Sequence, residues 1–184
     1  MGILFAQNSA LRIGLETTLG TSQTSTTEDV RIVSSTLQVS QTRERRTHLS
    51  VPTSGMLSGT FDGFREAGGT IDLPVMYDGI GMLFKAALGN LSTAAGTPNV
   101  HTYTPSFDLP SMTIQFQRGT NLSNSMEKFT GCKVSSMTIS VEAGSEMTAS
   151  FDIISKDAAA RGALSPAIAL PAHDEVLHFE SGQL

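Results

Sequence analysis

The sequence predicts a mainly β protein, an antiparallel β-sandwich or barrel with one packed α-helix at about residues 79–88. Short runs that alternate apolar and polar residues recur along the chain, whereas one segment has helical spacing. Ser and Thr are abundant, and they suit the solvent-facing side of strands and their turns. With 184 residues, the chain is long enough for one core, so we expect a single domain over residues 1–184.

The first third of the chain indicates strands joined by a long loop. A weak alternation predicts a short strand at residues 10–17, and residues 29–41 predict a longer, irregular one. Residues 42–55 are polar and basic, which predicts a long basic loop before the next strand-like run at residues 56–61.

One helix is predicted after a strand at residues 70–77. Pro74 cannot donate to a ladder, so this strand lies at a sheet edge or ends there. Asp78 is the predicted N-cap, and Gly89 is the predicted stop. The apolar residues between them fall on one helical face: Ile80, Leu83, Phe84, Ala87 and Leu88.

The second half predicts paired strands. Residues 100–107 and 112–118 flank a turn at Asp108. Residues 133–142 and 146–155 alternate around a turn at 143–145, which predicts a hairpin with one apolar and one polar face.

Composition excludes several classes of function. A net charge of −5 opposes tight binding of nucleic acid, because that affinity comes largely from Lys and Arg. Cys132 is the only cysteine, so an intramolecular disulfide is impossible. No apolar run approaches the length of a membrane helix.

Two long segments of the chain are the most telling: GGTIDLPVMYDGIGMLFKAALG at 68–89 and FTGCKVSSMTISVEAGSEMTASFDIISKD at 129–157. They resemble a family of siphophage tail tube proteins, and the resemblance extends over roughly residues 14–157. Family members often continue beyond a segment such as HFESGQL at 178–184. This chain is therefore either a short member or one that lacks further C-terminal strands.

The resemblance implies a structural virion protein, the major tail tube subunit, with no enzyme activity and no cofactor. Such subunits form rings, hexameric in the well-known members, that stack helically into a hollow tube and conduct phage DNA during ejection. The implied partners are other copies of the chain and the tape measure, tail terminator and distal tail proteins. DNA would pass without sequence-specific binding, and the protein would be made in the host cytoplasm and reside in the virion, away from membranes.

Two groups of residues are candidate sites. The basic cluster of Arg43, Arg45, Arg46 and His48 suits a subunit interface, where Arg forks pair with carboxylates; a solvated loop and a DNA contact are the alternatives. The polar face of the 133–155 hairpin carries carboxylates and hydroxyls, so it suits a lumen wall or an outer solvent-facing surface. The predicted lumen-facing residues are Glu142, Asp152, Ser140 and Ser150.

The sequence matches enzyme motifs only weakly. Gly79 and Gly81 resemble the start of a phosphate loop, but Phe84 stands at the third glycine position. Cys132 is interpreted as a core residue, with no spacing that argues for a dyad with His101.

Metal binding is equally weakly indicated. The group His173, Asp174, Glu175 and His178 lacks the spacing of a zinc motif, so we interpret it as solvated.

Two other functions compete with the tail tube. A connector or distal tail protein would share the sandwich fold. A ligand-binding sandwich module is disfavoured because such modules present aromatic platforms, and this chain has no Trp and only Tyr77 and Tyr103.

Overall fold

The computed structural model describes residues 9–23, 27–47, 57–97, 99–118, 126–162 and 176–177. Its elements in chain order are β1 (Ala10–Leu15), β2 (Glu28–Val30), β3 (Ser34–Ser35), β4 (Gln38–Thr47), β5 (Leu57–Pro74), α1 (Gly81–Leu88), β6 (Gly89–Ala94), β7 (Val100–Pro105), β8 (Met112–Gln117), β9 (Met126–Ser140), β10 (Thr148–Ser155) and β11 (Asp157–Gly162).

Nine of the described strands form one folded antiparallel sheet in the order β2-β1-β8-β9-β10-β5-β3, with β11 beside β9 and β4 beside β5. Strands β6 and β7 form a separate two-stranded sheet. β9 joins the two layers, because residues 126–132 pair with β8 or β11 and residues 133–140 pair with β10. Gly131 lies at this change of partner with φ of 64°, and a Cβ there would lie 2.8 Å from Cβ of Lys156. The predicted mainly β, sandwich-like fold is confirmed.

The hydrophobic core contains side chains from both layers. Strands β1, β8 and the first part of β9 supply one wall, and β5 and β10 supply the other. Helix α1 adds Leu83 and Ala86. The fully buried residues include Leu11, Ile13, Ile71, Leu73, Leu83, Ile114, Phe129, Cys132 and Phe151.

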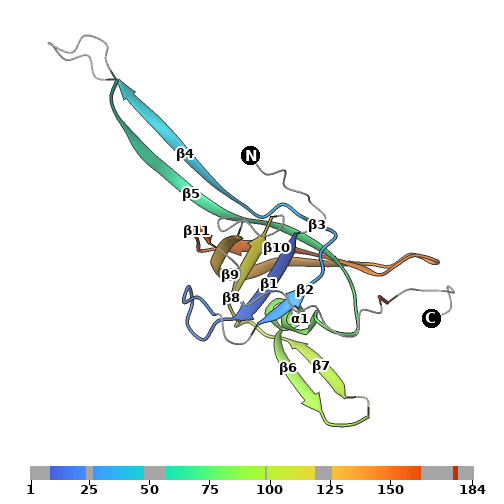
Figure 1. Ribbon diagram of the computed structural model, residues 1–184. Helices are drawn as coiled ribbons and strands as arrows, with labels where there is room; N and C mark the ends of the chain where they lie inside the picture. The colour runs from blue at the N-terminus through green and yellow to red at the C-terminus, as the bar shows by residue number, and fades with distance from the viewer. Residues whose placement is uncertain are drawn as a thin grey trace.

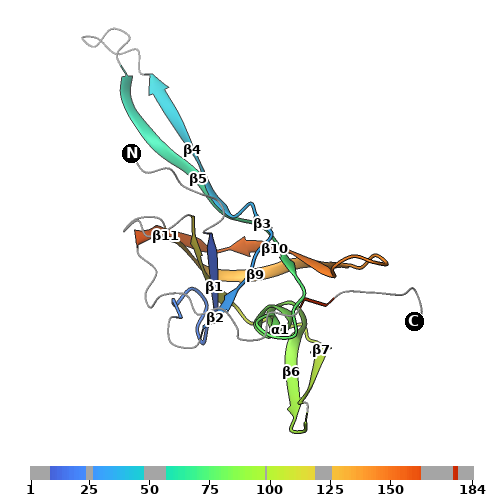
Figure 2. The ribbon, with the colours of Figure 1, turned by 45° about the vertical axis from the view of Figure 1, so that its right-hand side comes forward.

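Three hairpins project from this body (Figures 1 and 2). The longest, which we call the arm, is β4 with the first half of β5. The β6–β7 hairpin projects beside α1 on the opposite side, and the β9–β10 hairpin extends in a third direction.

The arm corrects the prediction of a loop at residues 42–55. Residues 42–47 belong to β4, which pairs with β5 from Gln38 opposite Gly68 to Thr47 opposite Leu57. The prediction failed because both faces of the arm are exposed over residues 38–44 and 64–66, so its strands carry polar and charged residues on both sides and lack apolar alternation. Residues 48–56 lie outside the described part of the chain.

A second correction concerns β7. It pairs with β6 rather than with β8, because residues 89–94 form a strand that was not predicted. The β9–β10 hairpin is confirmed: Ser140 lies opposite Thr148, and the turn is closed by Ser145 N–H donating to the Glu142 carbonyl at 3.1 Å.

The helix is confirmed, but its start differs from the prediction. Ile80 is the N-cap without a side-chain hydrogen bond, and the Asp78 carboxylate instead accepts from Gly79 N–H at 2.9 Å. Gly89 ends the helix at φ of 102°. Phe84 lies between Phe151 and the β7 residue Tyr103, with ring centroids 6.2 Å and 5.7 Å away. No helix in the described residues is both long and apolar enough to span a membrane.

Two polar contacts fix β1 inside the sandwich. Arg12 donates through Nε and Nη2 to Asp29 at 2.6 Å and 3.0 Å, and this buried pair joins β1 to β2. The Glu16 carboxylate accepts from Thr113 Oγ1 at 2.8 Å, Gly131 N–H at 2.9 Å and Gly20 N–H at 2.8 Å. Burial acts to raise the pKa of Glu16, but these hydrogen bonds outweigh it and hold the pKa below its ordinary value of 4.5.

We predict that Glu16→Gln lowers the free energy of unfolding by about 1–3 kcal/mol, because an amide NH₂ replaces one acceptor and faces an N–H donor. The folded-state pKa is depressed, so the charged Glu16 stabilises fully above pH 4.5. The difference in the free energy of unfolding between wild type and variant therefore shrinks as the pH falls through the folded-state pKa of Glu16. Chemical denaturation at several pH values measures this. Exposed Glu146→Gln is the control, with a change within about 0.5 kcal/mol. Equal stability of Glu16→Gln and wild type at pH 7 would contradict it.

Candidate functional site

The solvent-facing side of β3, β5, β10 and β9 carries a network of hydroxyls and carboxylates. Asp72 Oδ1 accepts from Ser150 Oγ at 2.6 Å, and its Oδ2 accepts from Ser34 Oγ. Asp152 Oδ2 accepts from Ser136 Oγ at 2.5 Å. Its Oδ1 accepts from Thr70 Oγ1 at 2.8 Å. We call these residues the carboxylate ladder: Ser34, Thr70, Asp72, Ser136, Ser150 and Asp152.

Sheet register places these side chains together. Asp72 lies opposite both Ser34 on β3 and Ser150 on β10. Asp152 lies opposite Thr70 on β5 and Ser136 on β9. Directly opposite residues in an antiparallel pair share a face, so one register aligns two carboxylates with four hydroxyl donors.

The hydroxyls stabilise the charged form of the ladder. Hydrogen bonds from Ser136 and then Thr70 lower the pKa of Asp152. The ladder contains no Lys or Arg; Lys133, opposite Ile154, is the cation that borders it on β9. The arrangement gives a wet, anionic surface without a cluster of cations that could hold phosphates.

The structure brings some of the predicted lumen residues together. Ser150 and Asp152 belong to the ladder, and Ser140 continues the same face of the hairpin toward its turn. Glu142 lies beyond the end of β9, in the turn, and is exposed.

The predicted polar face of the hairpin did not include Asp72, Thr70 and Ser34. The alternation of residues 70–74 did place Thr70 and Asp72 on one polar face, but the register between β5 and β10 was needed to connect them to the hairpin.

The opposite face of the β9–β10 hairpin differs from the prediction of a buried surface. Ala149, Phe151 and Ile153 are buried, but Ile139 and Val141 are exposed. The hairpin extends past the body there, so no layer of the described chain covers these side chains (Figure 1).

The described part of the basic cluster, Arg43, Arg45 and Arg46, lies on strand β4 rather than in a loop. Arg43 Nε contacts Asp62 Oδ1 at 3.0 Å, a cross-strand ion pair exposed on both sides. Arg45 and Arg46 lie opposite Thr60 and Gly59 in β4–β5 register. His48 lies outside the described residues.

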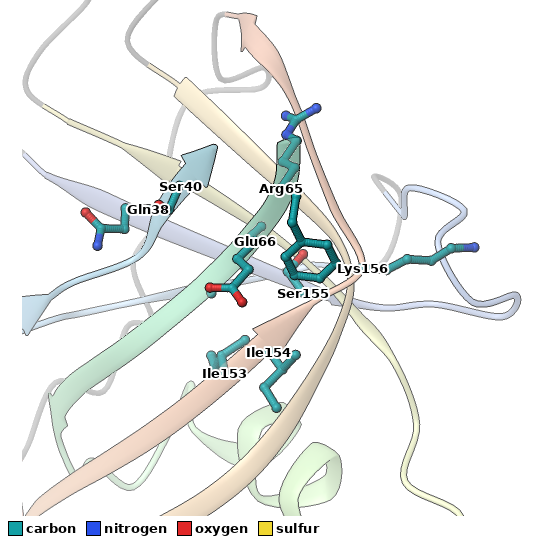
Figure 3. Close-up of a pocket in the computed structure, with 11 residues that line it drawn as sticks. Gln38, Ser40, Arg65, Glu66, Ile153, Ile154, Ser155 and Lys156 are labelled. Carbon is teal, nitrogen blue, oxygen red and sulfur yellow. The ribbon is translucent and has the colours of Figure 1, made fainter. Parts of the chain in front are cut away.

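A groove of about 590 Å³ lies at the base of the arm, and we call it the arm groove. Figure 3 shows Gln38 and Ser40 on β4, Arg65 and Glu66 on β5, and Ile153 to Ser155 on β10 around it. Phe64 also lines it. The charged ends of Arg65 and Lys156 point away from Ile153 and Ile154 (Figure 3).

A second pocket, of about 650 Å³, lies beside α1 and includes Tyr77, Tyr103 and Glu28. Burial raises the pKa of the Glu28 carboxyl, which accepts from Met82 N–H at 3.4 Å. Both tyrosines of the chain thus line one pocket, next to the glycines Gly79 and Gly81.

The reactive-residue candidates do not form a site in the described part of the chain. Burial raises the pKa of the Cys132 thiol to about 12, so this cysteine is a core residue, as predicted, rather than a nucleophile. No group of three His, Cys, Asp or Glu side chains suited to a metal occurs among the described residues. His173, Asp174, Glu175 and His178 lie outside them.

Comparison with known proteins gives one family. A family model described as phage tail tube protein matches residues 6–183. The fold is similar to a chain in the cryo-EM structure of an extracellular contractile injection system, a PVC sheath-tube complex in the extended state. The TM-score is 0.51 at 13% identity, covering 88% of this chain and 93% of that chain. A chain of the anti-feeding prophage cap gives a TM-score of 0.49 at 11% identity, covering 89% and 93%. No curated protein matches the chain.

We predict that Ser136→Ala combined with Thr70→Val raises the pKa of Asp152, because both hydroxyl donors to its carboxylate are removed. A carboxyl-detected NMR titration of the subunit measures the pKa directly. Thr138→Ala, on the same face of β9, is the control and should leave Asp152 unchanged. An Asp152 pKa equal in the double variant and the parent would show that the ladder does not stabilise the charge.

Proposed function

The chain belongs to the phage tail tube protein family, whose members are structural tail proteins rather than enzymes, and from this premise we propose a specific role. The protein is the major tail tube subunit of a siphophage. Its copies polymerise as hexameric rings, and the rings stack helically into a hollow tube that conducts DNA during ejection. Each subunit contributes one sandwich domain.

Unpaired strand edges support assembly into rings. In the described chain, residues 135–140 of β9 pair with β10 on one side only, and β3 pairs only with β5. Exposed edges of this kind favour pairing with another chain, and closure of a ring removes them. The exposed Ile139 and Val141 beside the β9 edge suit burial in the same contact.

The carboxylate ladder is the observation that carries the proposed conduit. DNA binds proteins largely through Lys and Arg contacts to phosphate, so a wall for sliding DNA should be polar, anionic and poor in cations. Asp72 and Asp152, each bound by two hydroxyls, meet this demand on the face of β3, β5, β10 and β9. We assign this face, with Ser140 and Glu142 at the hairpin end, to the lumen.

The arm suits contact with a neighbouring subunit. It extends well beyond the body, and its strands carry Arg43, Arg45 and Arg46 (Figure 1). We place this cluster, with His48, at a subunit interface, where guanidinium groups pair with carboxylates. Arg43 already shows such a pairing with Asp62.

Other tail components complete the proposed particle. The tape measure protein occupies the lumen before ejection, and the tail terminator and distal tail proteins close the two ends of the tube. The family makes the chain a virion component. Synthesis occurs in the host cytoplasm.

Negative-stain microscopy of the purified protein tests the proposed function, with tubes of uniform diameter as the expected result. The triple variant Arg43→Ser, Arg45→Ser and Arg46→Ser should fold with circular dichroism like the parent but form tubes poorly. Asp78→Ser, an exposed position away from the arm, is the matched surface control. A parent protein that stays monomeric under all conditions would overturn the function. A triple variant that forms tubes as readily as the parent would remove the arm from assembly.

The lumen assignment predicts a defect in DNA passage. Particles with Glu142→Lys and Asp152→Lys should assemble, yet eject DNA several-fold more slowly at low salt, because added cations hold phosphates. Higher salt should restore the rate. The neutral pair Glu142→Gln and Asp152→Asn controls for loss of the carboxylates and should eject normally. Normal ejection by the lysine variant at low salt would contradict the assignment.

A further inference from the structure

Phe107 is an aromatic side chain held out into solvent. Its relative exposure is 111%, although aromatic residues usually bury their rings. The segment around it is fixed to the body, because Ser106 N–H donates to the Leu88 carbonyl at 2.7 Å and Asp108 N–H donates to Ser106 Oγ at 3.3 Å. Phe107 is therefore presented rigidly next to the C-terminal end of α1.

The arm groove offers an apolar site on another part of the molecule. Phe64 and Ile154 line it with relative exposures of 77% and 63%. Its volume of about 590 Å³ is within the range of sites that enclose ligand groups, and ample for a phenyl ring. Exposed aromatic and aliphatic side chains around a groove mark a surface that a partner covers.

The charges around the two features are complementary. Asp108 follows Phe107 directly and is exposed. Arg65 and Lys156 lie at the arm groove together with one anion, Glu66. Arg65 Nη1 contacts Asp157 Oδ1 at 3.4 Å, and both side chains are about half exposed. Arg65 is therefore already paired, and its Nη2 also donates to the Ala158 carbonyl. Lys156 has no such ion pair among the described residues, so it is the cation at the arm groove that can meet the carboxylate beside Phe107.

The two features lie on opposite ends of the subunit. The arm leaves the body at one end, and α1 with the β6–β7 hairpin lies at the other in both views (Figures 1 and 2). Phe107 is attached to the α1 end, so the groove that it can reach belongs to a second copy. Such a contact is heterologous, and repeated copies form a ring or a stack.

We propose that Phe107 of one copy inserts into the arm groove of the next copy, between Phe64 and Ile154, with Asp108 directed toward Lys156. This inference rests on the proposed function, because it names a contact through which the subunits polymerise. It goes beyond the basic cluster by assigning a complementary pair of surfaces.

A cysteine cross-link tests the contact. Copies carrying Phe107→Cys are mixed with copies carrying Ile154→Cys under assembly conditions and then oxidised. Cys132 does not compete, because it is buried and its thiol pKa is raised to about 12. We expect a cross-linked dimer of the two variants. Phe107→Cys mixed with Tyr77→Cys is the control, since Tyr77 is 71% exposed but outside the groove, and it should stay uncross-linked.

A mixing experiment tests the direction of the contact. Phe107→Ser alone and Ile154→Asp alone should each lose polymerisation, with melting temperatures unchanged because both side chains are exposed. A mixture of these two variants retains one intact Phe107, on the Ile154→Asp copy, and one intact arm groove, on the Phe107→Ser copy. It should therefore give 1:1 heterodimers and no tubes, as measured by native mass spectrometry and light scattering.

The outcomes separate the contact from the function. If the parent forms tubes, equal tube formation by Phe107→Ser, or no cross-link in the mixture of Phe107→Cys and Ile154→Cys copies, would overturn the contact and leave the tail tube function standing. A parent that forms no tubes would overturn the function. If the mixture of Phe107→Cys and Ile154→Cys copies also gave no cross-link, the contact would be overturned as well.

Discussion

The buried Glu16 carboxylate is the constraint on which the two layers of the sandwich depend. It binds Gly131 N–H at the point where β9 leaves one layer and joins the other, and it also holds Thr113 on β8 and Gly20. Since β9 is shared by both layers, a fixed bend at Gly131 fixes the position of β10 and β5 relative to β1 and β8. The polar face and the arm groove are both built on β5 and β10, so their geometry follows from this contact.

The carboxylate ladder shows how an exposed sheet can be anionic and still ordered. Two neighbouring carboxylates on a sheet would repel each other, but each of Asp72 and Asp152 accepts hydroxyl donors from both adjacent strands. The same bonds that stabilise the charge also tie β3, β5, β10 and β9 together across the face. Ser and Thr are therefore abundant for a physical reason: they supply donors without supplying positive charge.

Periodicity in the sequence predicted those helices and strands that bury one face and expose the other. The β9–β10 hairpin and the helix face with Leu83 were found in this way. The arm was missed, because strands solvated on both sides have no alternation to detect, as in residues 38–44, all of which are exposed. The carboxylate ladder was predicted only in part. The alternation of residues 148–152 predicted their polar face, but the position of Asp72 beside it depends on the long-range register between β5 and β10. The exposure of Phe107 could not be predicted from neighbouring residues, because an apolar residue near a turn is equally compatible with a buried position.

We propose that the subunit turns its carboxylate ladder inward and its exposed strand edges toward its neighbours. A cryo-EM reconstruction of assembled tubes, at a resolution that traces side chains, measures this most directly. We expect rings in which Asp72 and Asp152 line the channel, with β9 of one subunit beside β3 or β4 of the next. A tube whose ladder faces the outer solvent, or whose channel is lined by α1 and the β6–β7 hairpin, would contradict it.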